Sequence, residues 1–365
     1  MAYTTIDDPS AYFQTLLYSG NATGSRALTN TGNSDLQPDW VWIKERTSTS
    51  AHKLLDSTRG VSLALGSNTT NADESFAFLS SFDSDGFTIG TSDGSTNASG
   101  DTYAAWQWKA NGGTTTSQTG SDIDSVTQAN TTSKFAIITY TGASNADSDS
   151  DNNSGAYWRV KHGLGSTPKL AIFKNRSNAA GWYVWHHKLG GTQDQKYLQL
   201  QRTNAVATES DILFGNTDWS STEFEIGAWD VVNRDGTTYV AYMFDEVQGY
   251  SKFGSYTGNN NADGTFVYTG FKPAWLMLKN YDDSGSTANW YMFDNKRDTD
   301  NVVQNIIHPN ANDAASDSAV CDFLSNGFKF RTADNAWNGN GDDYIYMAFA
   351  ESPFVSSEGV PTTAR

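Results

Sequence analysis

Short apolar runs alternate with longer polar intervals along the chain, and the apolar runs recur in the same order three times. One type of run begins with Pro and ends with Lys, and it occupies residues 38–44, 168–174 and 273–279. These runs are rich in aromatic and branched side chains and are flanked by Gly, Asn and Asp, which is typical of short strands joined by turns. The pattern therefore predicts strands rather than helices.

Two further runs follow each Pro-led run at nearly constant distance. The first is centred on a Phe at positions 87, 224 and 328, and the second on a Tyr at positions 103, 239 and 344. The Phe and the Tyr lie 16, 15 and 16 residues apart in the three copies. Each copy also opens on a Tyr-Ser-Gly or Tyr-Thr-Gly turn, at Tyr18, Tyr140 and Tyr256. Matching order and spacing predict one folding unit used three times.

The predicted fold is all-β, with three tandem antiparallel β-sandwich domains of jelly-roll type. We expect these domains at residues 1–112, 134–251 and 252–354, with the first as the candidate virion anchor in the function considered below. Residues 113–133 are dominated by Thr, Ser, Gly, Gln and Asn and are predicted to be a polar linker. Residues 355–365 are predicted to be a short tail.

The amino-acid composition limits the kinds of core and of binding partner that this protein can have. Only 37% of the residues are hydrophobic but 13% are aromatic, so Trp, Tyr and Phe must form most of the core. The formal net charge of −17 would repel nucleic acid phosphates, and we expect no nucleic acid partner. No apolar run approaches the roughly 20 residues of a membrane helix, and the first residues do not resemble a signal peptide, so we expect no membrane insertion and synthesis in the cytoplasm.

Candidate catalytic residues are scarce. The single cysteine, Cys321, excludes an intrachain disulfide and a cysteine-based zinc site. The five histidines form no metal-binding motif, and no Gly-x-Ser-x-Gly sequence is present. Paired aspartates occur only where turns are expected, and Asp commonly caps turns. We therefore predict a protein that is not an enzyme and has no catalytic cofactor.

Three tryptophans in polar loops are candidates for glycan binding: Trp219, Trp229 and Trp337. The neighbouring polar candidates are Asp230 and Asn338. A flat ring can stack on the CH face of a sugar while Asp and Asn accept or donate hydrogen bonds to its hydroxyls. The alternative is that these rings anchor their own loops.

The second copy carries an insertion in which Asp147, Asp149 and Asp151 alternate with Ser. Alternating carboxylates are found in calcium loops, but an EF-hand requires Gly at the sixth place and Glu at the twelfth. This chain has Asn152 and Trp158 there. A weak calcium site and a solvated loop both remain open.

Several segments resemble tail-fibre-type virion proteins of marine and cyanobacterial bacteriophages. Residues 5–15 and 36–44 resemble the start of such proteins, and residues 162–169, 252–259 and 323–329 resemble their later repeats. The likeness spans nearly the whole chain, although the first copy lacks the His-Gly-Leu-Gly turn found at 162–165.

The resemblance implies a virion structural protein, a tail fibre or tail-associated surface protein located on the tail or particle surface. It also implies a homotrimer that contacts other virion proteins and a host-surface glycan or receptor. One alternative is a capsid decoration or tail-tube-associated protein, and a second is a glycan depolymerase. No binding residues are carried over from the family.

Overall fold

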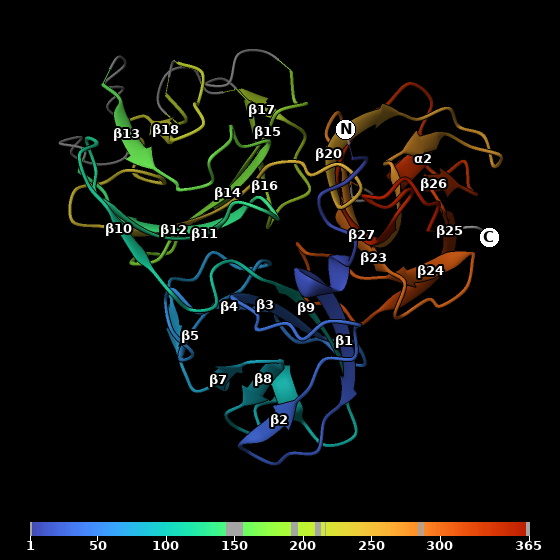
Figure 1. Ribbon diagram of the computed structural model, residues 1–365, viewed down its shortest axis with the longest axis horizontal. Coiled ribbons are helices and arrows are strands. Elements are labelled where there is room, and N and C mark those ends of the chain that lie inside the picture. Colours follow the sequence, from blue (N-terminus) through green and yellow to red (C-terminus); the bar gives the residue numbers. More distant parts are fainter. Residues whose placement is uncertain are drawn as a thin grey trace.

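A computed structural model describes residues 2–143, 156–190, 196–208, 213–215, 217–283, 285 and 288–362. The fold is all-β with antiparallel sheets, as the sequence predicts. The strands gather into three lobes arranged around a common centre (Figure 1). We call them lobe 1 (residues 2–112), lobe 2 (113–250) and lobe 3 (251–354).

Lobe 1 contains a six-stranded sheet and a three-stranded sheet packed face to face. The large sheet has the order β1-β9-β3-β4-β5-β6 and the small sheet the order β2-β8-β7. Their bounds are β1 Phe13–Ser19, β2 Arg26–Leu28, β3 Trp40–Glu45, β4 Lys53–Asp56, β5 Leu63–Leu65, β6 Glu74–Ser75, β7 Leu79–Asp83, β8 Gly86–Ile89 and β9 Thr102–Trp108.

Lobe 2 repeats this plan with a larger main sheet. The order is β10-β11-β12-β19-β14-β15-β16-β17, and a two-stranded sheet β13-β18 covers it. Their bounds are β10 Thr116–Gln118, β11 Ser125–Asn130, β12 Phe135–Thr141, β13 Trp158–Lys161, β14 Leu170–Asn175, β15 Trp182–His186, β16 Lys196–Gln199, β17 Ala207–Thr208, β18 Glu223–Ile226 and β19 Thr238–Phe244.

Lobe 3 pairs two four-stranded sheets, β20-β27-β22-β23 and β21-β26-β25-β24. Their bounds are β20 Ser251–Thr257, β21 Phe266–Tyr268, β22 Phe271–Asn280, β23 Trp290–Asp294, β24 Val303–Ile306, β25 Ser316–Leu324, β26 Gly327–Phe330 and β27 Asp343–Pro353. The helices in the described residues are single short turns: η1 Pro9–Ala11, α1 Gly94–Asn97 and α2 Asn335–Asn338.

The three main sheets share one strand order. In each, the opening strand pairs with the closing Tyr strand, which pairs with the Pro-led strand, which pairs with the next strand along the chain. The series are β1-β9-β3-β4, β12-β19-β14-β15 and β20-β27-β22-β23. The recurring sequence pattern thus corresponds to a recurring topology.

The prediction that residues 113–133 form a polar linker is wrong. It contains β10 and β11, and β11 pairs along its whole length with β12. Gln128 is fully buried, and its amide donates to the hydroxyls of Ser57 and Thr58 in lobe 1, each at 2.8 Å. Polar composition suggested a solvated chain, but here the polar side chains form hydrogen bonds across the interface between two lobes.

A large aromatic core lies where the three lobes meet. Side chains alternate along β3. Val41 and Ile43 face the core between the two sheets of lobe 1, whereas Trp40 and Trp42 face the core that the three lobes share. Trp40 stacks on Tyr242 of lobe 2 with ring centroids 4.4 Å apart. Trp108 contacts Trp275 of lobe 3 edge-on at 5.5 Å. Both faces of each main sheet are therefore buried, which explains why the Pro-led runs are continuously apolar.

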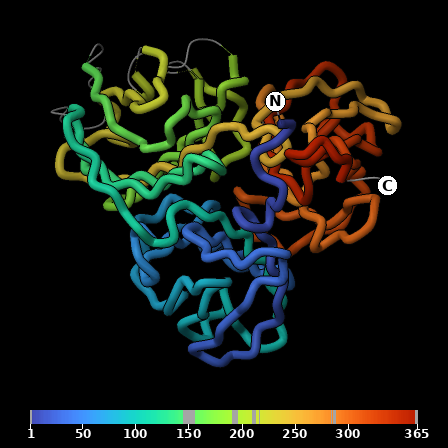
Figure 2. The backbone as a smooth tube through the Cα atoms, in the orientation of Figure 1, coloured from blue at the N-terminus to red at the C-terminus, as the bar shows by residue number. Residues whose placement is uncertain are grey.

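Three buried lysines connect the lobes in a cycle. Lys44 of lobe 1 donates to the carbonyl of Asn312 in lobe 3 at 3.2 Å. Lys174 of lobe 2 donates to Thr70 in lobe 1 at 3.4 Å, and Lys279 of lobe 3 donates to Thr203 in lobe 2 at 3.3 Å. Each lysine also donates to the carbonyl of the residue that follows it: Glu45, Asn175 and Asn280. Equivalent residues thus make equivalent contacts, and the chain closes into a ring of three lobes (Figure 2).

Buried ion pairs secure two of the three lobe interfaces. Arg59 pairs with Asp56 at 2.5 Å, and the hydroxyl of Tyr242 in lobe 2 donates to the same carboxylate at 2.7 Å. Arg297 pairs with Asp294 at 2.6 Å, and the indole of Trp106 in lobe 1 donates to that carboxylate at 3.0 Å.

The third interface uses different chemistry at the matching positions. His186 occupies the position in lobe 2 that Asp56 and Asp294 occupy in the other lobes, since each of the three pairs with the residue two places after the Pro of its Pro-led run. Its ring contacts the carbonyl of Tyr346 in lobe 3 at 3.3 Å.

A tyrosine pair holds one loop in each lobe. Tyr103, Tyr239 and Tyr344 stack on the opening tyrosines Tyr18, Tyr140 and Tyr256 with centroids 5.0, 5.2 and 4.7 Å apart. Each closing Tyr hydroxyl donates to the carbonyl nine residues before it and accepts from the amide five residues before it. The recurring Tyr positions thus fix the loop that precedes the last strand.

The glycine after each opening Tyr is required by close packing. A Cβ at Gly20 would lie 1.9 Å from the carbonyl oxygen of Ala98, and one at Gly142 would lie 2.3 Å from that of Arg234. Gly258 is similarly confined by Gly339. The Tyr-x-Gly signature therefore marks where the opening strand meets the loop held by the closing Tyr.

Replacing this glycine tests the arrangement. We expect Gly20→Ala to destabilise the protein by about 1–3 kcal/mol, because the added methyl overlaps a backbone carbonyl. Gly94→Ala in the same lobe is the matched control, since nothing lies within 4 Å of its Cβ, and its effect should stay within about 0.5 kcal/mol. Urea unfolding measures both. Equal effects would contradict the proposed packing role.

Candidate functional site

The tryptophans predicted as glycan platforms are mostly buried. Trp219 and Trp337 are only 4% and 5% exposed, so the expectation of accessible rings is wrong for both. Trp337 packs edge-on against Tyr291 at 4.8 Å, in the core of lobe 3. Trp229 is half-buried and contacts Tyr183 at 5.2 Å. The alternative, that these rings anchor their loops, is what the structure shows for Trp219 and Trp337.

The polar candidates beside them also have structural contacts. Asn338 is fully buried, and its amide donates to the carbonyls of Asn261 and Thr332 at 2.9 and 2.8 Å. The backbone carbonyl of Asp230 accepts the hydroxyl of Tyr239. Asn97, Asn233 and Asn338 each lie six residues before the closing Tyr and are all fully buried. That shared spacing is a sequence signal that Asn338 belongs to the structure that all three lobes share.

The calcium candidates Asp147, Asp149 and Asp151 lie outside the described residues. Within the part of the chain that is described, no group of three or more His, Cys, Asp or Glu side chains is placed to hold a metal ion. None of the described helices is both long and apolar enough to cross a bilayer.

The histidines have structural roles. His52 accepts the indole N–H of Trp42 at 2.8 Å, and its other ring nitrogen lies 3.0 Å from the carbonyl oxygen of His308. A neutral ring with its proton on Nε2 satisfies both contacts. Burial lowers the pKa of His52 to about 3, of His162 to about 4 and of His186 to about 3. These rings are therefore neutral at pH 7 and contribute to packing.

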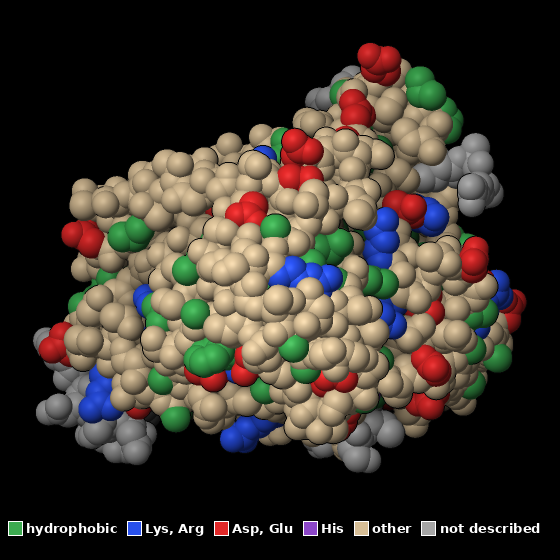
Figure 3. Space-filling model, turned by 90° about the horizontal axis from the view of Figure 1, so that it is seen from below, with side chains coloured by type: hydrophobic (Ala, Val, Ile, Leu, Met, Phe, Trp, Pro, Cys, Tyr) green, Lys and Arg blue, Asp and Glu red, His purple; other side chains and the backbone are tan. Residues whose placement is uncertain are grey.

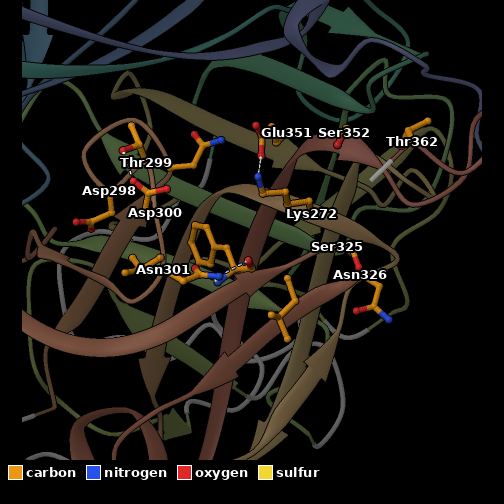
Figure 4. Close-up of a pocket in the computed structure, with 14 residues that line it drawn as sticks. Lys272, Asp298, Thr299, Asp300, Asn301, Ser325, Asn326, Glu351, Ser352 and Thr362 are labelled. Atoms are coloured by element: carbon orange, nitrogen blue, oxygen red, sulfur yellow. Dashed lines mark hydrogen bonds and ion pairs between the residues drawn. The ribbon is translucent and has the colours of Figure 1, made fainter. Parts of the chain in front are cut away.

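A surface cavity with a volume of 710 Å³ lies on lobe 3. The loop between β23 and β24 forms one side, and the β25–β26 turn and the end of β27 form the other (Figure 4). Amide, hydroxyl, carboxylate and ammonium groups line it together with a few apolar side chains. The lining residues are Lys272, Asn295, Asp298, Thr299, Asp300, Asn301, Val303, Phe323, Leu324, Ser325, Asn326, Glu351, Ser352 and Thr362.

Hydrogen bonds hold the walls of this cavity in place. One oxygen of Asp298 accepts the backbone amides of Gln304 and Asn305, at 3.0 and 2.8 Å. The side chain of Asn301 bridges the N–H and carbonyl of Phe323 at 2.8 and 3.0 Å. Lys272 pairs with Glu351 across the rim at 2.6 Å. The loop is thus tied to the strands, and Asp300 at its tip is exposed to solvent.

Residues 8–353 match a family described as a domain of unknown function, DUF7483. The chain belongs to the DUF7483 family. The match spans all three lobes as one unit, in keeping with the core that they share. No curated protein and no solved structure matches the chain.

This DUF7483 protein carries a formal net charge of −17, with 41 acidic and 24 basic residues. On the face shown in Figure 3, acidic and basic side chains are scattered among polar and backbone atoms, and no continuous basic patch is present on that face.

The neutral histidines predict loss of stability in acid. Their folded pKa values lie below the unfolded value of about 6.5, so the unfolded chain binds more protons as the pH falls below that value. Between pH 6.5 and about 4, the free energy of unfolding should fall by up to about 1.4 kcal/mol per pH unit for each histidine. Urea titrations at several pH values measure this slope.

A His186→Gln variant should show a shallower slope over the same pH range, because one of the three buried protonation sites is removed. A wild-type stability that stays constant from pH 7 to 4 would contradict this reading of the buried rings.

Proposed function

We propose that this protein is a non-enzymatic bacteriophage virion surface protein, of the tail-fibre or tail-associated type, that contacts a host-surface glycan. The proposal is supported by the resemblance of residues 5–15 and 36–44 to such proteins and by the all-β architecture. The three lobes share one core, and their connecting loops lie on the outside of the molecule. Binding residues are commonly found on loops of this kind.

The 710 Å³ cavity on lobe 3 is the observation that supports the proposed glycan contact. Sugars offer many hydroxyls that both donate and accept hydrogen bonds, and this cavity offers groups of both kinds. Its lining includes the apolar residues Val303 and Phe323, and its volume lies within the range of about 300–1,000 Å³ that is typical of small-molecule sites.

The contacts in this cavity favour binding over hydrolysis. A glycoside hydrolase uses two carboxyl groups, one to protonate the leaving oxygen and one to attack or activate water. In the lobe 3 cavity, Asp298 accepts backbone and side-chain hydrogen bonds, and Glu351 is paired with Lys272. Asp300 extends from the loop tip, and its carboxylate accepts the hydroxyl of Thr299 at 3.3 Å. Clearing of host exopolysaccharide by the purified protein, abolished by one Asp or Glu substitution, would instead support a depolymerase.

Assembly is part of the proposal. The core that joins the lobes is filled within a single chain, so the proposed homotrimer would use other surfaces. Neighbouring virion proteins are the other proposed partners. A capsid decoration or tail-tube-associated protein differs in location, and labelling on intact particles separates that alternative from a tail protein.

Competition tests the receptor role. Purified protein should reduce phage adsorption, and a variant with Asp300→Ala and Asn326→Ala should need about fivefold or more protein for the same inhibition, since it lacks two polar groups of the cavity. The control variant, Asn33→Ala with Asp35→Ala, changes two exposed polar residues of lobe 1 and should inhibit as well as wild type. Normal adsorption of virions that lack this protein, or in which antibody covers it, would refute the role.

A further inference from the structure

One edge of lobe 3 exposes two aromatic rings. Among the described strands, β21 pairs only with β26, and along it Phe266 and Tyr268 point outward while Val267 points into the core. Phe266 is 44% exposed and Tyr268 is 54% exposed. Large apolar rings exposed side by side on a protein with few apolar residues mark an interaction site.

The same positions differ in the other lobes. The core residue that pairs with the recurring Phe is Leu28 in lobe 1, Val160 in lobe 2 and Val267 in lobe 3. Its outward neighbours are small in lobe 1 and basic in lobe 2, and aromatic in lobe 3. These neighbours are Ala27 and Thr29, Arg159 and Lys161, and Phe266 and Tyr268. The fold that the lobes share thus requires an apolar residue at the core-facing position of this strand, but it does not require aromatic residues at the solvent-facing positions.

Tyr268 borders a cavity of 420 Å³ at the junction of the N-terminal segment with lobes 2 and 3. The hydroxyls of Tyr268 and Tyr3 lie 3.1 Å apart, and Tyr3 donates to the carbonyl of Gly270 at 2.8 Å. Gly270 leaves room for this pair, since a Cβ there would lie 2.8 Å from the Tyr3 hydroxyl. The remaining lining residues are Glu246, Gln248, Ser251, Lys252 and Thr269.

Charge in this cavity is nearly balanced. Glu246 lies 3.2 Å from Lys252, and its second oxygen accepts the backbone amide of Phe253 at 3.0 Å. The carboxylate, the Gln248 amide and the two phenols can bond to hydroxyls. The protein carries a net charge of −17, so an anionic ligand would be repelled at low salt.

We infer that the Tyr3–Tyr268 cavity is a saccharide-binding site, in which a neutral or amino sugar stacks on Tyr268 and bonds to the phenols, Glu246 and Gln248. Sugar CH faces suit an exposed ring, and polar groups around it fix the orientation. The site is separate from the 710 Å³ cavity and deepens the proposed glycan contact, on which it rests.

Calorimetry on the full chain tests this inference. The probes are short oligomers of glucose, galactose, mannose and N-acetylglucosamine, with uronic acid oligomers for comparison. Tyr268→Ala should weaken binding of the preferred neutral oligomer about tenfold, whereas Tyr268→Phe should weaken it less than about threefold because the ring remains. Phe76→Ala, which removes an exposed ring of lobe 1, is the matched control and should bind as wild type.

Uronic acid oligomers should bind at least about fivefold more weakly than neutral ones at low salt. Equal binding by Tyr268→Ala and wild type would overturn the inference, and so would no binding of any neutral oligomer. If a neutral oligomer binds but only the Asp300→Ala and Asn326→Ala variant loses it, the proposed function stands and this site fails. If Tyr268→Ala leaves saccharide binding intact but prevents incorporation into particles, the edge contacts a virion protein instead.

Discussion

Burial of every main sheet on both faces is the constraint from which the rest of the structure follows. A β-sandwich lobe normally buries one face of each sheet and leaves the other to solvent. Here the outer face of each main sheet is covered by the second sheet of its own lobe, and the inner face packs on the aromatic residues of the other two lobes. Trp40, Trp108 and Trp275 meet at this centre. The lobes are therefore parts of a single cooperative body.

Polar groups define how the lobes are oriented around that centre. Aromatic packing tolerates sliding, whereas a buried carboxylate or ammonium must find its partner in one geometry. The Asp56–Arg59 pair requires the hydroxyl of Tyr242, and the Asp294–Arg297 pair requires the indole of Trp106. Burial also lowers the pKa of Lys44 and Lys174 to about 8 and of Lys279 to about 7, so each lysine depends on the carbonyls that surround it.

The sequence predicted the all-β fold and the recurring strands because these depend on local pattern. The spacing of Phe and Tyr identified strands that the structure places at matching positions. Residues 113–133 were misjudged because Gln128 and Asn130 of β11 form hydrogen bonds with lobe 1, which composition cannot reveal. Trp337 was misjudged for a related reason: a polar loop folds back on the sheet, and a sequence does not show which way its ring points. The exposure of Tyr268 could not be predicted from the sequence, because it depends on the register of β21 against β26.

The cyclic lysine contacts limit how this architecture can change. In an open array such as a solenoid, a terminal unit contacts one neighbour, and copies can be gained or lost at the ends. Here lobe 1 contacts lobe 3 as well as lobe 2, so each lobe both gives and receives a buried lysine bond. Deleting one lobe would leave a buried ammonium without its carbonyl on one side and open the aromatic centre to water. Diversification of this architecture must therefore proceed by altering outer loops and strand edges, with the number of lobes held constant.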